Sequence, residues 1–326
     1  MNEQEIIQNL FLPLADGFEG SLGLRDDAAI INNLNDQKIV VSKDMLVSGI
    51  HFFENDHPTA IAKKSLRVNL SDIAAMGAKP ICYLLGLSLP KKDNVSWIKD
   101  FCEGLKREQE FYHCSLAGGD LVSSTGLVSI SITIFGSLSN NSMLLRSRAQ
   151  VDDDVWVSGT IGDAGVALLL LTGGIKLKPD FPQSHRDYLE SRLRSPTPRL
   201  SLGEKLLSFA SSACDISDGL LSDLSNICNA SELGASISSN LIPISSEVSR
   251  VIKEVETVSI MDLISAGDDY ELIFTARTRH SDHILEISQK LGLKLTKIGK
   301  MTQELGVVLD GEFLKQSEVK MGYGHF

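Results

Sequence analysis

Aspartates recur along the chain in short segments, and carboxylates are the ligands that bind divalent metal ions and, through them, phosphates. They are Asp26 and Asp27, Asp44, Asp72, Asp120, Asp215 with Asp218, and Asp268 with Asp269. Taken singly, an aspartate is usually structural, because aspartate is common in turns and at helix N-caps. Carboxylates gathered from both halves of the chain would repel one another unless divalent ions lay among them. Oxygen ligands alone favour Mg²⁺, Mn²⁺ or Ca²⁺ over zinc, so the simplest interpretation is Mg²⁺ with a polyphosphate.

The contexts of three aspartates in the first half support this interpretation. Asp72 lies inside a predicted helix, where aspartate is disfavoured, and it shares a helix face with Asn69. Asp44 directly follows the apolar strand IVVS, and Asp120 follows a glycine pair that ends with Gly119. We therefore expect Asp44 and Asp120 at strand ends, where α/β proteins collect ligands, and the glycines would let a ligand approach the backbone.

In the second half, Asp215, Ser217 and Asp218 occur in the segment DISDGLLSDL, where a strand is predicted to turn into a helix. Capping of that helix by Ser217 or Asp218 explains these two residues as well as ligand binding does. Asp215 has no capping role, so it is the stronger candidate ligand.

The first half is predicted to combine strands and a helix around these residues. Residues 39–42 and 81–89 are apolar runs typical of buried strands, and 128–136 alternates isoleucine and valine with serine and threonine, as a half-buried strand does. Residues 59–76 have one apolar helical face and are followed by Gly77, which is placed to end a helix.

The second half repeats the mixture of strand and helix. A charged segment precedes a new strand, so we place a boundary near residues 140–150 and expect domains 1–145 and 146–326. The elements expected beyond it are a strand over 155–158, a helix from about Ala164, and one helix over about 184–193 within the long connection 173–199.

Composition and missing motifs exclude several classes of protein. The net charge is −11 and the 31 Lys and Arg residues form no basic run, which argues against nucleic acid or an anionic membrane as partner. Five scattered cysteines, with no C-x-x-C spacing, are expected to be reduced core thiols. The start of the sequence lacks a basic signal region and no apolar run could span a bilayer, so the expected location is the cytoplasm.

The chain also lacks the P-loop, protein-kinase and H-E-x-x-H signatures. Gly159, Gly162 and Gly165 weakly echo a dinucleotide-binding fingerprint, but no second strand ending in an acid follows at the required distance. A simple strand-to-helix turn is the expected structure there.

The ordered motifs resemble those of the thiamine-monophosphate kinase family, whose superfamily includes aminoimidazole ribonucleotide synthetase and selenophosphate synthetase. The matching segments are RDDAAI (25–30), SKDMLVSGIHF (42–52), NLSDIAAMGAKP (69–80), AGGD (117–120), RSRA (146–149), DISDGLLSDL (215–224), AGDDYEL (266–272) and GYGHF (322–326). They cover nearly the whole chain. The segments DMLVSGIHF and GYGHF distinguish this family within the superfamily.

The resemblance implies a two-domain α/β (α+β) fold, with an N-terminal ATP- and magnesium-binding sheet that pairs across a homodimer to form a barrel and a C-terminal synthetase-like α/β domain. The implied reaction is direct phosphoryl transfer from ATP to thiamine phosphate. The implied Mg²⁺ ligands are Asp27, Ser42, Asp44, Asp72, Asp120, Asp215 and Asp218. The implied ATP contacts are Gly119, Asp120, Arg146 and Ser217, and the implied contacts to thiamine phosphate are His51, Asp268 and Tyr323.

We assign no catalytic base, because a phosphate monoester with a second pKa of about 6 is mostly dianionic at neutral pH and can attack without one. The chain departs from the family pattern at Arg25, Lys43, Arg148 and Asp268. Lys43 replaces a usual hydroxyl residue, and we expect it to perturb one metal site. The alternatives are another ATP-using synthetase of the superfamily, a nucleotide-binding protein with a decayed site, and a metal-stabilised structural domain, although the calcium-loop spacing is absent.

Overall fold

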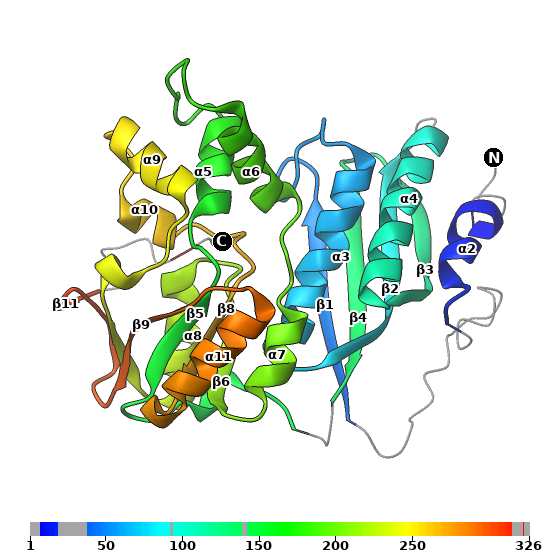
Figure 1. Cartoon of the computed structure of the whole chain (residues 1–326). Helices are drawn as coiled ribbons and strands as arrows, with labels where there is room; N and C mark the ends of the chain where they lie inside the picture. Colours follow the sequence, from blue (N-terminus) through cyan, green and yellow to red (C-terminus); the bar gives the residue numbers. More distant parts are fainter. Residues whose placement is uncertain (1–6, 19–37, 92–93, 139–141, 315–321, 323–326) are drawn as a thin grey trace. The chain divides into compact units, whose positions relative to one another are not determined.

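The computed structural model describes residues 7–18, 38–91, 94–138, 142–314 and 322. The chain divides into two compact units. The first comprises Met1–Ile73 and Ala78–Ser142, and the second comprises Ala74–Gly77 and Met143–Phe326. Both units combine α-helices with a β-sheet, as the sequence predicts (Figure 1).

The first unit contains a four-stranded mixed sheet of strand order β1-β4-β2-β3. Its elements are a π-turn over Ile7–Phe11, α2 (Leu12–Ala15), β1 (Ile39–Val47), α3 (Pro58–Ala75), β2 (Lys79–Pro90), α4 (Val95–Tyr112), β3 (Ser115–Ser124) and β4 (Ser129–Ser137). Helices α3 and α4 lie on one face of this sheet (Figure 1). The sheet is open in the single chain, so the barrel implied by the resemblance is not present within one copy.

The helix predicted over 59–76 is confirmed as α3, and Gly77 follows it with a φ of 69°. Ala62, Leu66 and Ile73 on its apolar face have no exposed surface. In β4 the predicted alternation is also confirmed, because Ile130, Ile132 and Ile134 are buried and the residues between them are half-buried.

Strand β1 is longer than the predicted strand 39–42. It pairs antiparallel with β4 over nine residues, from Ile39 opposite Ser137 to Val47 opposite Ser129. Asp44 therefore lies within the strand and not beyond its end. Similarly, Asp120 lies inside β3 and not at its end.

The second unit contains a seven-stranded sheet of order β11-β10-β7-β9-β5-β8-β6, in which only the β10–β7 pair is parallel among the described strands. Its strands are β5 (Asp154–Ser158), β6 (Ala210–Asp215), β7 (Gly234–Ile237), β8 (Leu272–Ala276), β9 (Leu295–Thr302), β10 (Gly306–Leu309) and β11 (Glu312–Phe313). Its α-helices are α5 (Asp163–Leu171), α6 (Gln183–Arg194), α7 (Leu200–Leu206), α8 (Leu220–Ser231), α9 (Ser246–Glu254), α10 (Ile260–Ile264) and α11 (Ser281–Leu291).

Both faces of this sheet are covered at β5. Successive side chains of a strand point to opposite sides, and all five residues of β5 are buried. Val155 and Val157 of β5 pack in one core together with apolar residues of α8. Trp156, between them, packs in a second core with residues of α7 and α11. Burial on both sides explains why Val155, Trp156 and Val157 in the middle of β5 are all apolar.

The five cysteines are free and buried, which confirms the predicted core thiols. Burial raises the pKa of Cys82 to about 11. In the part of the chain that the structure describes, no helix has both the length and the apolar character needed to cross a bilayer.

Candidate active site

In the first unit, β1 and α3 bring together three of the predicted metal ligands. Ser42 and Asp44 lie on the same face of β1, and both are half-buried. The hydroxyl of Ser42 donates a hydrogen bond to Asp72 Oδ2, and the backbone N–H of Asp44 donates to Asn69 Oδ1 at 3.1 Å. Asn69 and Asp72, three residues apart on one face of α3, thus contact Asp44 and Ser42, two residues apart on one face of β1. This arrangement offers a cluster of oxygen ligands and no nitrogen or sulfur ligand.

Lys43 does not join this cluster. Its side chain is exposed, while Ser42 and Asp44 on either side of it are half-buried. Because side chains alternate along a strand, Lys43 points to the opposite face of β1. Its ammonium group therefore does not face Ser42 or Asp44, and the structure gives no direct contact by which Lys43 would perturb that cluster.

Strand register separates Asp120 from the cluster. Asp120 is opposite Gly86 of β2, Gly86 is opposite Ser131 of β4, and Ser131 is opposite Met45 of β1. Residues opposite one another in a sheet share a face, so Asp120 lies with exposed Met45 and not with Asp44.

Gly119, predicted to contact ATP, has a structural role in the sheet. A Cβ at this position would lie 1.9 Å from the carbonyl oxygen of Leu85, so only glycine allows β3 to approach β2 this closely.

His51 lies in the turn that follows β1. Its backbone N–H donates to the Val47 carbonyl at 3.0 Å, and its Nδ1 accepts from the Val47 N–H at 3.0 Å. Because Nδ1 is an acceptor, a neutral His51 carries its proton on Nε2, which is then a donor. The turn therefore fixes the tautomer of His51.

In the second unit, β6 ends at Asp215 and a short loop leads to α8. Asp215 is 3% exposed, and Arg146 lies within electrostatic reach of it. Asp223 in the first turn of α8 accepts the backbone N–H groups of Ser217 and Asp218, each at 3.1 Å. Burial and the charge of Asp218 raise the pKa of Asp223 to about 7.

Neither Ser217 nor Asp218 caps helix α8. The N-cap residue is Gly219, whose φ of 119° suits glycine, and it makes no side-chain cap. The capping explanation for the pair is therefore not supported, and both residues belong to the loop whose backbone N–H groups Asp223 binds.

The segment that carries Asp268 packs directly on this loop. The N–H of Asp268 donates to the Ser217 carbonyl at 2.8 Å, and that of Tyr270 donates to the Ile216 carbonyl at 2.8 Å. Asp268 and Tyr270 both have left-handed backbone conformations, with φ of 70° and 50°. Such conformations are costly for residues with a side chain, so the surrounding hydrogen bonds must hold them.

Two predicted site residues, Asp27 and Tyr323, lie outside the described residues. Gly322, which precedes Tyr323, is described, and a Cβ there would lie 2.6 Å from the Asp218 carbonyl oxygen. Within the described ranges, no three acidic, histidine or cysteine side chains are close enough together to hold a metal. The ligands predicted from the sequence come from both units, and the complete set remains a prediction.

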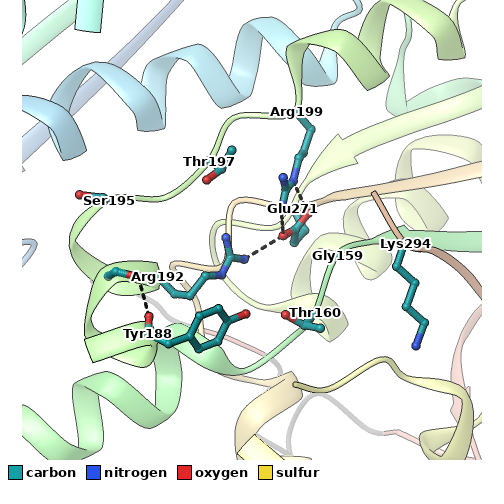
Figure 2. A pocket seen from close by; sticks show the side chains of 10 residues that line it. Gly159, Thr160, Tyr188, Arg192, Ser195, Thr197, Arg199, Glu271 and Lys294 are labelled. Atoms are coloured by element: carbon teal, nitrogen blue, oxygen red, sulfur yellow. Dashed lines mark hydrogen bonds and ion pairs between the residues drawn. The ribbon is translucent and has the colours of Figure 1, made fainter. Parts of the chain in front are cut away.

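The sequence did not indicate a network of buried ions behind the Asp268 segment. Glu271, with no exposed surface, accepts hydrogen bonds from the guanidinium groups of Arg192 and Arg199 (Figure 2). Arg192 Nη2 also donates to the Asp269 carbonyl at 3.3 Å. Asp269 accepts the Gly162 N–H at 2.8 Å, and burial raises the pKa of Asp269 well above its usual value.

These charges are about 70 to 80 residues apart in sequence, so no local motif reveals them. Of the glycines that echoed a dinucleotide fingerprint, Gly159 and Gly162 belong to the turn between β5 and α5, as expected, and Gly165 lies in the first turn of α5. Gly159 and Gly162 of this turn have left-handed φ values of 60° and 88° and pack close to other residues of the second unit.

Comparison with known proteins covers almost the whole chain. Residues 25–138 match the family described as AIR synthase related protein, N-terminal domain, and residues 150–311 match the corresponding C-terminal domain. A thiamine-monophosphate kinase of Buchnera aphidicola subsp. Acyrthosiphon pisum is 36% identical over 306 residues, which are 93% of this chain and 92% of the relative.

Two solved structures are also similar. The crystal structure of thiamine-monophosphate kinase from Stenotrophomonas maltophilia K279a superposes with a TM-score of 0.83 at 37% identity, covering 96% of this chain and 98% of that one. A structure of AaThiL complexed with AMPPCP and TMP has a TM-score of 0.79 at 29% identity, covering 100% and 99%.

Proposed function

Because this chain belongs to the thiamine-monophosphate kinase family, we infer that it transfers the γ-phosphoryl group of ATP to thiamine phosphate, forming thiamine diphosphate and ADP. Similarity to a curated kinase over 93% of the chain is the observation that carries this inference. The similar AaThiL complex holds AMPPCP, an analogue of ATP, together with TMP, which supports the same pair of substrates.

We propose that magnesium is the metal, because the clustered donors are oxygens. In the first unit the proposed ligands are Ser42, Asp44 and Asp72, with Asp27 predicted beside them, and in the second unit they are Asp215 and Asp218. The predicted ligand Asp120 faces the other side of the first sheet. The hydrogen bond between Ser42 and Asp72 fits this role, because it brings oxygen atoms of two proposed ligands together. Bound magnesium would supply charge neutralisation on the phosphates.

The residues of the second unit would position the substrates around the acidic loop. Arg146, beside Asp215 and Asp223, is suited to bind a phosphate of ATP, because a guanidinium can donate two parallel hydrogen bonds. Ser217, whose N–H and carbonyl are held by Asp223 and Asp268, would contact the same nucleotide. Gly119 would contact ATP from the first unit.

Asp268, His51 and Tyr323 are proposed to contact thiamine phosphate. The carboxylate of Asp268 is oriented by an unusual backbone conformation and would suit the permanently cationic thiazolium ring. The aromatic face of Tyr323 would favour the same cation by about 1 to 2 kcal/mol. The attacking phosphate oxygen is already ionised at neutral pH, so the mechanism needs no general base.

We also propose that the enzyme is a cytoplasmic homodimer whose first-unit sheets pair into a barrel. Val41, Met45 and Val122 leave 55%, 56% and 47% of their surfaces exposed on that sheet. Apolar side chains grouped on a sheet face are typical of a surface that another chain covers. Asp120 shares this face and would then lie at the dimer interface.

The direct test is to incubate the purified protein with ATP, Mg²⁺ and thiamine phosphate and to measure thiamine diphosphate by chromatography, with thiamine as a parallel substrate. Product should form from thiamine phosphate only. Asp44→Ala should lose nearly all activity, because it removes a proposed metal ligand. Glu110→Ala, which removes an exposed carboxylate on α4 of the same unit, is the matched control and should retain activity.

Mg²⁺-dependent ATP binding without any product would contradict the kinase assignment and favour a decayed, binding-only site. Activity that survives Asp44→Ala would leave the kinase assignment in place but would exclude Asp44 from the metal site.

A further inference from the structure

A pocket in the second unit contains none of the residues proposed above for ATP, metal or thiamine phosphate. It has a volume of about 430 Å³, and its polar lining includes Arg192, Arg199, Lys294 and Thr197 (Figure 2). We propose that this pocket is a second binding site for a small phosphate-type anion. Its size lies within the range of pockets that take small metabolites.

The carboxylate of Glu271 in this pocket has no capacity left for a ligand. Its Oε1 accepts from Nη2 of both Arg192 and Arg199, and its Oε2 accepts from Arg199 Nε and Ser158 Oγ, each at 2.6 Å. All four acceptor positions are therefore used, and a ligand that donates hydrogen bonds finds no free oxygen on Glu271.

Both guanidinium groups, in contrast, keep donors available. Arg192 and Arg199 use Nε and Nη2 in their contacts with Asp163, Glu271 and the backbone, and their side chains are 11% and 17% exposed. Within the described ranges, the Nη1 group of neither arginine has a hydrogen-bond partner. A guanidinium that is fixed by one carboxylate and presents its remaining N–H groups is prepared to bind a second anion.

Lys294 adds a third positive charge at the rim of the pocket. Its carbonyl accepts the Gly159 N–H at 2.8 Å, which ties Lys294 to the end of β5. Its side chain is exposed and forms no ion pair with any described residue. The hydroxyl of Thr197, also exposed, has no hydrogen-bond partner among the described residues and would provide one more donor.

The charge balance of the pocket is positive in a chain of net charge −11. Three of the residues that line the pocket are cationic, Arg192, Arg199 and Lys294, and one is acidic, Glu271. Excess positive charge and unused donors favour an acceptor-rich dianion, such as inorganic phosphate or a phosphate monoester, over a neutral or cationic ligand.

The experiment titrates the full chain, in EDTA and without nucleotide, with inorganic phosphate and separately with glycerol phosphate, and measures binding by calorimetry and the shift in Tm. Saturable binding is expected, and Lys294→Gln should weaken it roughly 3- to 10-fold. Lys290→Gln, an exposed lysine on α11, is the matched control and should leave the affinity unchanged. Tighter binding of glycerol phosphate identifies a phosphorylated metabolite as the ligand class, and tighter binding of inorganic phosphate identifies the free ion.

Asp215→Asn separates this pocket from the proposed active site, because it alters the acidic loop and leaves the pocket lining intact. Anion binding should persist in Asp215→Asn. Binding that is lost in Asp215→Asn but kept in Lys294→Gln would overturn the proposal, as would equal loss in both lysine variants or no saturable binding at all. Kinase activity is not a readout here, so failure of the proposed function would not be confused with failure of this inference.

Discussion

Glu271 illustrates how single buried residues hold the segment that carries Asp268. It has no exposed surface, its two oxygens accept four hydrogen bonds, and it lies three residues after Asp268. A buried ion pair adds little stability over an apolar replacement, but removing one partner leaves the other charge uncompensated. The stability of the fold therefore depends on the negative charge of Glu271, which compensates the two arginines that bind it.

Glu271→Gln should lower the free energy of unfolding by about 3 kcal/mol, because the amide leaves the guanidinium of Arg199 without a counter-charge and that of Arg192 with Asp163 alone. Urea denaturation followed by circular dichroism measures this change. Glu286→Gln is the control, since Glu286 pairs with Lys290 at the surface of α11 and should change stability by less than about 0.5 kcal/mol. Equal effects of the two variants would mean that burial of Glu271 does not matter.

The buried carboxyl of Asp269 predicts a pH dependence of stability. Burial raises its pKa in the folded protein well above the value in the unfolded chain. Between these two pKa values the folded state keeps a proton that the unfolded state releases, so stability decreases as pH rises through this interval. Below about pH 4 both states are protonated and this residue has no effect.

Asp269→Asn removes the ionisable carboxyl group and keeps the shape of the side chain. The stability of Asp269→Asn relative to wild type should therefore increase with pH above about 4, by at most about 1.4 kcal/mol per pH unit. Denaturation midpoints at about pH 5, 6 and 7 measure the difference. Asp282→Asn, at an exposed position of α11, is the control for removing a carboxylate from the protein surface. A constant difference for Asp269→Asn would show that the carboxyl is ionised in the folded state.

For single residues, the sequence predicted which side chains share a face of an element more successfully than it predicted which side chains of other elements they contact. The pairing of Asn69 and Asp72 on one helix face followed from the helical period, and it is confirmed by their contacts with β1. The opposite orientation of Asp120 depends on strand register, which the sequence did not reveal. The Glu271 network joins residues of different elements, and no periodic pattern indicates such contacts.

At the scale of elements, Gly159 shows why the turn after β5 needs a glycine. Its φ is 60°, and a Cβ would lie 2.2 Å from Glu271 Oε1. The absence of a side chain thus lets the carboxylate of Glu271 lie against the backbone at the end of β5.

Gly159→Ala should destabilise the second unit by at least about 2 kcal/mol, since it adds a steric clash to an unfavourable backbone conformation. Gly173→Ala separates the two effects, because Gly173 has a similar φ of 75° but open space around its Cβ. Gly173→Ala should cost only about 1 kcal/mol. Thermal unfolding of both variants tests the prediction, and identical losses would show that the contact with Glu271 adds nothing.

Several elements were predicted correctly from periodicity, and the one strand predicted too short has a physical explanation. The predicted strands at 81–89, 128–136 and 155–158 and the helix at 184–193 are confirmed within two residues. Strand β1 was predicted too short because charged residues interrupt its apolar run after Ser42. Its true length is set by nine pairings with β4, a partner almost a hundred residues later in the chain.

At the scale of the whole molecule, the proposed dimer can be tested on the exposed face of the first sheet. Val41→Lys should convert dimer to monomer, because it places a second lysine beside Lys43 on a face proposed to be buried, while a lysine there costs the single chain little. Light scattering coupled to size-exclusion chromatography measures the mass. Leu285→Lys, at a 48% exposed position of α11, is the control and should remain dimeric. A wild-type mass of one chain would exclude the dimer.

The strand order of the second sheet has a consequence for synthesis of the chain. Strand β5 is the first strand of its sheet to be made, yet its two neighbours are β8 and β9, which begin at Leu272 and Leu295. A ribosome making about 5 to 20 residues per second needs several seconds to reach them. During that time Val155, Trp156 and Val157 have no native strand partner. The nascent second unit thus exposes an aggregation-prone segment that a chaperone would be expected to cover until β9 emerges.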